Sequence, residues 1–296
     1  MGQTTFYYVA ATLPEHGAAL KDWPGETLVA GRAVTASIAA ADAAAADTRI
    51  AEVWPGMDDA KVDCYRLDAP PSKKRLLIAD MESTIIAQEM LDELADAVGL
   101  REQVEAITAS AMRGELDFES AINERVALLK GLDASVLDQM ATDRMTYMPG
   151  ARELVASMKA AGAYCALVSG GFTHFTAIVA RELGFDEHRA NTLEIADGKL
   201  TGRVVPPILG REAKLQALEE LTAQHGFDVG DAIAVGDGAN DLAMLKAAGL
   251  GVAFRAKPAV RDAMAAHKRG VVVNHCDLTA LLYVQSYIEA DIRTGS

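Results

Sequence analysis

The stretch IADMESTII, residues 78–86, places two acidic side chains directly after a short apolar run. Residues 75–80 read RLLIAD and have the composition of a buried strand, and ionised side chains are rarely buried without a partner or a function. Asp80 and Glu82 stand one residue apart at its end. A structural role is open to them, because a strand-end aspartate, or a hydroxyl residue after it, can cap a following helix.

Three further apolar runs repeat this pattern and alternate with amphipathic helical stretches. They are AYCALVS (163–169), DAIAVGD (231–237) and LGVAF (250–254). Such alternation predicts an α/β fold with a Rossmann-like parallel sheet and helices on both of its faces. Ligands bind these sheets at the carboxyl ends of the strands. Because Asp80, Ser169 and Asp237 all stand at strand ends, we expect them to meet in one site.

The first part of the chain, residues 1–70, has a composition of its own. Strands are predicted at 4–13 and 61–67, and the alanine-rich segment 33–46 favours a helix, because alanine has the highest helix propensity. The sequence APPSKK at 69–74 marks a boundary, because adjacent prolines stop regular structure. We therefore expect a small N-terminal α/β domain.

A long helical insertion is predicted after the first strand of the parallel sheet. Roughly 80 residues separate this strand from the next, too many for a simple crossover connection. We expect residues 89–146 to form a helical cap over the strand ends. The cap would interrupt a core domain made of residues 71–88 and 147–296.

The overall charge excludes one class of partner. The chain has 296 residues, of which 50% are hydrophobic, so a sizeable core is available. Its formal net charge of −14 argues against nucleic acid, whose phosphates such a surface would repel. An anionic substrate would have to be attracted locally, by a metal ion or by a few well-placed cations.

The compartment is predicted from cysteine usage and hydropathy. Cys64, Cys165 and Cys276 lie far apart, so neither a zinc site nor a disulfide framework is expected, and a reducing cytoplasm suits them. The N-terminus lacks the basic and long apolar regions of a signal peptide. The uncharged segment 160–180 contains glycines and hydroxyl residues, which favour a strand, a turn and a helix start over a membrane span. We expect a soluble cytoplasmic protein with no membrane partner.

Four clusters bring chemistry to the predicted site. Asp80 offers a carboxylate that can attack an electrophile, and Glu82 follows two residues later. The SGG turn at 169–171 offers a hydroxyl and backbone N–H groups for an anionic oxygen. Lys214 offers a cation near a helix start. The segment GDGANDLAM (236–244) supplies oxygen donors of the kind magnesium prefers: Asp237, Asn240 and Asp241. Each cluster alone has a structural reading, but their order along the strand ends favours a site.

This set of motifs resembles the phosphoserine phosphatases of the haloacid dehalogenase superfamily, over about residues 75–285. The first motif of that family is Asp-x-Asp-Ser-Thr, and residues 80–84 match it except at position 82. The resemblance implies a magnesium-dependent enzyme of serine biosynthesis. Its reaction would hydrolyse O-phospho-L-serine to L-serine and phosphate through an aspartyl-phosphate intermediate.

The resemblance also implies a role for each residue of the core motifs. Asp80 would be the nucleophile and Glu82 the general acid and base. The residues that would bind the phosphate are Ser169, Gly170, Lys214 and Asn240. The residues that would hold Mg²⁺ are Asp80, Glu82 (through its backbone carbonyl), Asp237 and Asp241.

Residues of the cap would recognise the rest of the substrate. By resemblance, Glu89 lies near the substrate ammonium and Arg125 holds its carboxylate, a role that suits the bidentate guanidinium. Met112 and Phe118 match apolar cap residues, although a place in the helix core suits them equally well. The mechanism needs no histidine, so we expect structural or surface roles for His16, His174, His188, His225, His267 and His275.

Glu82 departs from the family, which has aspartate at this position. The extra methylene moves the carboxyl by about 1.5 Å, enough to cost roughly 100-fold in a positioned site. Three interpretations stay open: a phosphoserine phosphatase with a compensating cap, a related phosphomonoesterase or phosphotransferase, and an impaired phosphoserine-binding protein. In phosphatases of this family an N-terminal extension is often a regulatory or dimerising module, which leaves a homodimer open.

Overall fold

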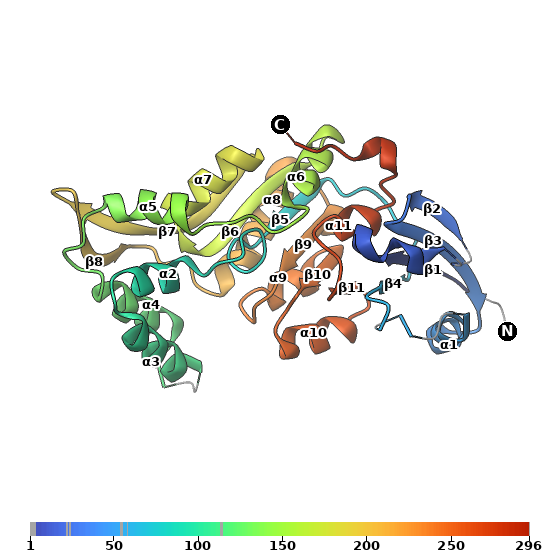
Figure 1. The fold of residues 1–296 in the computed structure, drawn as a ribbon, viewed down its shortest axis with the longest axis horizontal. Helices are drawn as coiled ribbons and strands as arrows, with labels where there is room; N and C mark the ends of the chain where they lie inside the picture. The colour runs from blue at the N-terminus through green and yellow to red at the C-terminus, as the bar shows by residue number, and fades with distance from the viewer. Residues whose placement is uncertain are drawn as a thin grey trace.

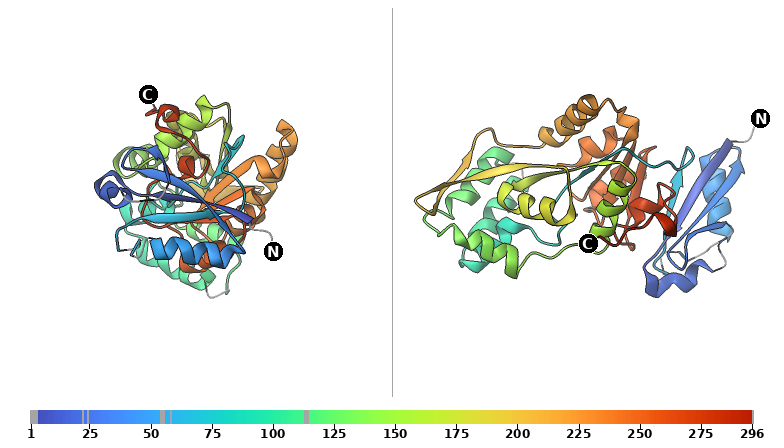
Figure 2. Two further views of the ribbon diagram at one scale, coloured as in Figure 1. Left: turned by 90° about the vertical axis from the view of Figure 1, so that its right-hand side faces the viewer. Right: turned by 90° about the horizontal axis from the view of Figure 1, so that it is seen from above.

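The structure is a computed structural model that describes residues 4–21, 23, 25–53, 56–57, 59–112 and 115–295. The molecule is elongated (Figures 1 and 2). A small sheet built from the N-terminal residues lies at one end, a group of short helices lies at the other, and a large sheet with helices on its faces lies between them. No helix in the described part of the chain has the length and apolar character to cross a bilayer.

The N-terminal residues form a four-stranded antiparallel sheet in the order β2-β3-β1-β4. The strands are β1 (Thr4–Ala11), β2 (Glu26–Val29), β3 (Ala33–Ala40) and β4 (Asp63–Leu67). The 3-10 helix η1 (Pro14–Leu20) follows β1, and helix α1 (Ala43–Val53) follows β3. This element order and sheet order are those of a ferredoxin-like βαββαβ unit. The strands predicted at 4–13 and 61–67 are confirmed as β1 and β4.

The helix predicted over 33–46 is wrong in its first part, where the chain forms β3. Val34, Thr35 and Ile38 are β-branched and favour a strand, and β3 pairs on both sides, with β1 and with β2. This pairing outweighs the helix propensity of the alanines, which is worth only tenths of a kcal/mol per residue. The helix starts after Asp42, whose Oδ1 accepts a hydrogen bond from Ala45 N at 2.8 Å.

The large sheet has seven strands in the order β11-β10-β9-β5-β6-β7-β8. The strands are β5 (Leu76–Ala79), β6 (Tyr164–Phe172), β7 (Glu187–Ala196), β8 (Lys199–Val205), β9 (Ala232–Gly236), β10 (Leu250–Phe254) and β11 (Gly270–Val273). Every neighbouring pair is parallel except the hairpin β7–β8. The expected parallel sheet and its four predicted strands are therefore confirmed, while β7, β8 and β11 were not predicted.

Helices bury both faces of this sheet. One face packs against α6 (Ala151–Ala160), α7 (Thr173–Leu183) and α11 (Ala280–Tyr283), and the other against α8 (Glu212–His225), α9 (Leu242–Ala247) and α10 (Pro258–Ala265). Along β5, Leu77 and Ala79 belong to the first hydrophobic cluster, whereas Leu76 and Ile78 belong to the second. This alternation explains why the sequence of β5 is apolar at every position.

Four helices stand between β5 and α6, in agreement with the predicted helical insertion. They are α2 (Met90–Ala97), α3 (Arg101–Met112), α4 (Phe118–Ala127) and α5 (Ser135–Asp143). Helix α4 packs on β8. Gly202 of β8 has a positive φ of 80°, and a Cβ there would lie 2.8 Å from Lys130 Cβ, so only glycine lets the hairpin come this close.

The small sheet is joined to the large one by buried polar contacts. The carboxylate of Asp63 accepts hydrogen bonds from three consecutive backbone N–H groups, those of Asn274 (3.1 Å), His275 (2.9 Å) and Cys276 (2.8 Å), just after β11. Arg32 pairs with Asp277 at 2.7 Å. Residues of both sheets also belong to one hydrophobic cluster, so the two parts share a core.

Candidate active site

The first motif forms a tight turn at the carboxyl end of β5. Asp80 is buried, its N–H donates to Val235 O of β9 at 3.0 Å, and its Oδ1 accepts a hydrogen bond from Met81 N at 2.7 Å. No helix starts directly after Asp80; α2 begins ten positions later, at Met90. The turn therefore holds the carboxylate at the edge of the sheet, and the helix-capping interpretation does not apply to Asp80.

A buried lysine connects two of the predicted site acids. Lys214, near the start of α8, places Nζ 2.7 Å from Asp80 Oδ1 and 2.6 Å from Asp241 Oδ1. Burial alone would lower the pKa of Lys214, but the two carboxylates overcome it and raise that pKa above its ordinary value. Lys214 therefore keeps its positive charge in the interior.

Three acids gather beside this lysine. One carboxylate oxygen each from Asp80, Asp237 and Asp241 lie within 4.8 Å of one another. Burial raises the pKa of Asp80 to about 7 and that of Asp237 to about 6, and the charge of Asp241 adds to both shifts. Three carboxylates that are hard to ionise together, faced only by the ammonium groups of Lys214 and Lys257 among the described residues, supply oxygen donors that fit a divalent cation such as Mg²⁺.

Two glycines shape the loop that carries Asp237, Asn240 and Asp241. A Cβ at Gly236 would lie 2.3 Å from Asp241 Cγ, and a Cβ at Gly238 would lie 2.3 Å from Asn240 Oδ1. Gly238 N also donates to Asp241 Oδ2 at 2.9 Å. The glycines thus allow the acid and the amide to fold back over the backbone toward the site.

The SGG turn lies beside this loop, within strand β6. Ser169 is buried, and its Oγ accepts a hydrogen bond from Gly171 N at 3.0 Å. Asn191 Nδ2 donates to Gly170 O at 2.8 Å and fixes the turn from β7. A small hollow next to it is lined by the four residues expected to bind phosphate, together with Phe118: Ser169, Gly170, Lys214 and Asn240.

Glu82 reaches from the motif to the first helix of the cap region. Its Oε1 accepts a hydrogen bond from Met90 N at 2.9 Å, and a Cβ at Gly171 would lie 2.8 Å from its Oε2. Burial, with repulsion from Glu89, raises the pKa of Glu82 to about 8, although the Met90 N–H opposes this shift. A carboxyl group that keeps its proton near neutral pH can act as a general acid.

The predicted cap residues border a cavity of about 140 Å³ above these groups. Arg125 and Glu89 line it together with Asp80 and Glu82. Arg125 Nε donates to Ala121 O at 3.2 Å, and among the described residues the guanidinium forms no ion pair. Glu89 Oε1 accepts a hydrogen bond from Ser83 Oγ at 2.8 Å.

The two apolar cap residues differ in what the structure describes. Phe118 is 37% exposed, and its ring lies over Gly170 and Gly210, 3.6 and 3.7 Å from where their Cβ atoms would be. Phe118 thus forms a wall of the site and is not part of a helix core. Met112 ends α3, and its side chain lies outside the described part of the structure.

Several residues of the site were not predicted from the sequence. Lys257 lines the cavity with Nζ 3.7 Å from Asp237 Oδ2, and Asp92 also lines it. Lys257 stands three residues after β10, so the rule that ligands bind at strand ends could have found it. Asn191 supports the SGG turn from β7, a strand that the sequence did not reveal. Among the residues that the structure describes, none of the six histidines lines the cavity.

Comparison with known proteins agrees with this geometry. A family model described as haloacid dehalogenase-like hydrolase matches residues 77–246. A phosphoserine phosphatase of Albidiferax ferrireducens is 50% identical over 202 residues, which cover 66% of this chain and 85% of the relative. The chain belongs to the haloacid dehalogenase-like hydrolase family.

Two further comparisons concern more of the chain. A phosphoserine phosphatase of Streptomyces coelicolor is 48% identical over 223 residues, covering 75% of this chain but 53%, about half, of that longer relative. A crystal structure of a probable phosphoserine phosphatase from Vibrio cholerae, in unliganded form, has a TM-score of 0.76 and 31% identity, covering 97% of this chain and 88% of the other. The likeness therefore includes the N-terminal sheet.

Proposed function

We propose that the protein is a magnesium-dependent phosphoserine phosphatase of serine biosynthesis, which hydrolyses O-phospho-L-serine to L-serine and phosphate. The observation that supports this proposal most directly is the buried carboxylate of Asp80, which contacts Lys214. It borders a cavity that is also lined by Glu82, a second acid with a raised pKa. The names of the two relatives above support the choice of substrate.

Asp80 would be the nucleophile. Its Oδ1 accepts a hydrogen bond from Met81 N and contacts Lys214, which leaves Oδ2 to attack phosphorus. A bond forms between Oδ2 and phosphorus while the bond from phosphorus to the serine oxygen breaks. Lys214 and the hydroxyl and N–H groups of the SGG turn would balance the charge of the phosphate oxygens.

Glu82 would move the protons. It gives its proton to the leaving serine oxygen, which is otherwise a poor leaving group. Its carboxylate then takes a proton from water, whose oxygen attacks phosphorus and releases Asp80. The pKa of about 8 suits the first step, and the proton taken from water in the second step restores the acid for the next turnover.

Mg²⁺ would be held by Asp80, Asp237, Asp241 and the backbone carbonyl of Glu82. When bound it supplies positive charge that lets a carboxylate approach a phosphate dianion. Lys214 contacts and orients Asp80 and Asp241, and Lys257 lies near Asp237.

The cavity fits an amino-acid phosphate. Arg125, which forms no salt bridge with the described residues, would hold the substrate carboxylate, and Glu89 would hold the ammonium. Phe118 would exclude water from the phosphate. We further propose that 89–146 is the cap domain, 71–88 and 147–296 the catalytic core, and 1–70 a regulatory module.

Phosphate release from three esters tests this proposal: phosphoserine, phosphothreonine and glycerol phosphate, each with Mg²⁺ and with a chelator. We expect phosphoserine to be preferred and the chelator to stop turnover. Asp80→Asn should stay folded, because the amide is nearly isosteric, and should show no turnover. Preference for glycerol phosphate would indicate a different phosphomonoesterase. Binding of phosphoserine without phosphate release would indicate an impaired enzyme.

A further inference from the structure

A second cavity, of about 270 Å³, lies at the junction between the two sheets. One wall is the segment 66–74, which leads from β4 of the small sheet to β5 of the large sheet. The opposite wall is formed by Gly249 and Leu250 at the start of β10 and by Lys268 and Arg269 just before β11. The cavity thus lies at the amino ends of these strands, whereas the candidate active site lies at their carboxyl ends.

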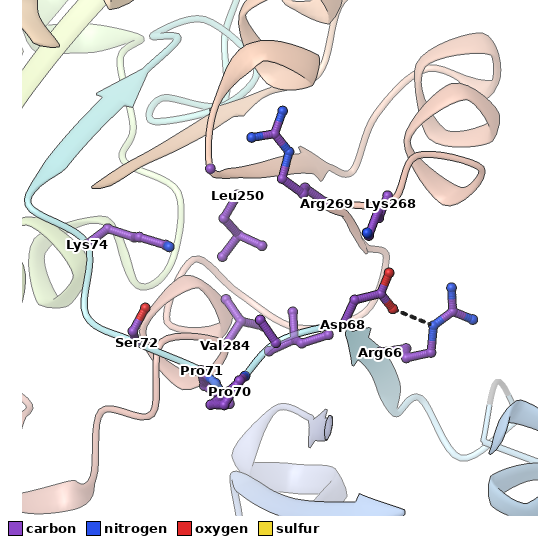
Figure 3. A pocket seen from close by; sticks show the side chains of 13 residues that line it. Arg66, Asp68, Pro70, Pro71, Ser72, Lys74, Leu250, Lys268, Arg269 and Val284 are labelled. Carbon is purple, nitrogen blue, oxygen red and sulfur yellow. Dashed lines mark hydrogen bonds and ion pairs between the residues drawn. The ribbon is translucent and has the colours of Figure 1, made fainter. Parts of the chain in front are cut away.

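The cavity has an apolar floor and a cationic rim. Leu67, Leu250 and Val284 are buried and form the floor, next to Pro70 and Pro71. Figure 3 shows Lys74, Lys268 and Arg269 arranged around this floor. Lys74 comes from the connecting segment, and Lys268 and Arg269 come from the turn that leads into β11, so the rim includes residues of both walls.

The three rim cations form no salt bridge with the described residues. Lys74 Nζ donates to the backbone oxygen of Gly230 at 2.9 Å, and Arg269 Nη2 donates to that of Lys246 at 3.3 Å. Among the described residues, neither they nor Lys268 form an ion pair. Partial burial lowers the pKa of Lys74, and although Asp231 opposes this, the nearby charge of Arg269 lowers it further.

The positive charge of this rim contrasts with the acidic character of the chain. The chain carries a net charge of −14, so acidic partners are abundant elsewhere. Lys268 and Arg269 are exposed and Lys74 is half-buried, and the repulsion among their charges is relieved when an anion binds. The only acid that lines the cavity among the described residues is Asp68, and it lies 3.4 Å from Arg66 Nε. Arg66 also lines the cavity and balances the charge of Asp68, so this acid does not neutralise the three rim cations.

We propose that this cavity binds a small organic monoanion, with a carboxylate head at the three cations and an apolar body on the floor of leucine, valine and proline. The ligand would contact both the connecting segment and the large sheet. Its binding would therefore fasten the N-terminal module to the catalytic core, independently of substrate. This site is separate from the function proposed above.

Hexanoate is a suitable probe, because it has one carboxylate and an unbranched apolar body. We expect hexanoate at about ten times its dissociation constant to raise the melting temperature by about 2 to 4 °C. Hexanol and hexylammonium serve as controls for the negative charge of the ligand, and inorganic phosphate serves as the control for its apolar body. Calorimetric titration of the full chain gives the dissociation constant directly.

Variants locate the binding. The double substitution Lys268→Ala and Arg269→Ala should weaken hexanoate binding at least about ten-fold, and Lys74→Met alone should also weaken it. Arg261→Ala is the matched control, an exposed cation on α10 outside the cavity. Arg125→Ala should bind hexanoate normally, which distinguishes this cavity from the candidate active site.

Four results would overturn the proposal. These are the absence of a shift with hexanoate, an equal shift with hexanol, an equal shift with inorganic phosphate, and unchanged affinity in the double variant. Loss of binding in Arg125→Ala alone would also overturn it, because the anion would then occupy the candidate active site. The phosphatase assay is not needed for any of these readouts, so the two proposals can fail separately.

Discussion

The carboxylate of Glu82 accepts a hydrogen bond from the backbone N–H of Met90, 2.9 Å away, so the second acid of the motif is tied to the first residue of α2. The extra methylene of glutamate makes this reach possible. Gly171 leaves the space that the longer side chain needs, since a Cβ there would lie 2.8 Å from Glu82 Oε2. These contacts favour a site adapted to glutamate over an impaired one.

Replacing Glu82 with aspartate tests this adaptation. We expect Glu82→Asp to lower kcat about ten-fold, which corresponds to roughly 1.4 kcal/mol, because the shorter side chain cannot reach Met90 N while it faces the substrate. Steady-state kinetics with phosphoserine measure the effect, and Mg²⁺ affinity should change little. A faster aspartate variant would instead show that the glutamate is a handicap inherited at this position.

The space at Gly171 gives a second, linked prediction. Gly171→Ala should lower kcat, because its Cβ would meet both carboxylate oxygens of Glu82, at 2.8 and 3.0 Å. In the Glu82→Asp background the same alanine should be tolerated better, since the shorter side chain withdraws from it. A double-mutant cycle in kcat gives the coupling. Additive effects would mean that Gly171 does not serve the acid at position 82.

Arg125 should control the choice of substrate. Arg125→Ala is expected to cost at least about 2 kcal/mol in kcat/KM for phosphoserine, because a charged hydrogen-bonded contact to the carboxylate is lost. Glycerol phosphate, which has no carboxylate, should be affected much less. Both esters are assayed on both proteins, with Arg261→Ala as a surface control. Equal losses for the two esters would assign Arg125 a structural role.

The acids of the site should make stability depend on pH and Mg²⁺. Burial raises the pKa of Asp80 from 3.8 to about 7, so between these values the folded protein holds a proton that the unfolded chain has lost. Because the folded state binds more protons in this window, the stability of the Mg²⁺-free protein falls as the pH rises through it. Asp237, with a pKa raised to about 6, acts in the same direction.

Mg²⁺ should therefore stabilise the protein more at pH 8 than at pH 5.5, since protons compete with the metal ion at the lower pH. Thermal melts with Mg²⁺ and with a chelator at both values measure the difference. Asp241→Asn serves as the control and should reduce the Mg²⁺ effect at pH 8. An equal Mg²⁺ effect at both pH values would show that these carboxyls do not bind the ion.

The sequence revealed those strands that are buried on both faces. β5, β6, β9 and β10 are nearly continuous apolar runs, which is the pattern of a central parallel strand, so their existence and approximate bounds were predictable. The hairpin β7–β8 carries charged and exposed residues such as Glu194 and Ile195 and has no such run. β3 was mistaken for a helix because pairing with two neighbours is a tertiary effect.

The site was predictable in residue type but not in geometry. Strand-end positions and the resemblance to a family drew attention to Asp80, Ser169, Lys214 and Asp237. The bond from Met90 N to Glu82 joins residues on either side of a loop, and nothing in the local pattern indicates it. Lys257 follows a predicted strand, so its position could have drawn attention to it, but its 3.7 Å distance from Asp237 is known only from the structure.

The three N–H groups that converge on Asp63 limit how freely the two sheets can be exchanged during evolution or in engineering. Without that carboxylate, the N–H groups of Asn274, His275 and Cys276 lose this acceptor. Each N–H group that is then left buried without an acceptor lowers the free energy of unfolding by about 1 to 3 kcal/mol. A foreign N-terminal module could therefore replace the native one only if it brought an acceptor to the same loop. The segment after β11 and the first residue of β4 can therefore be replaced only together.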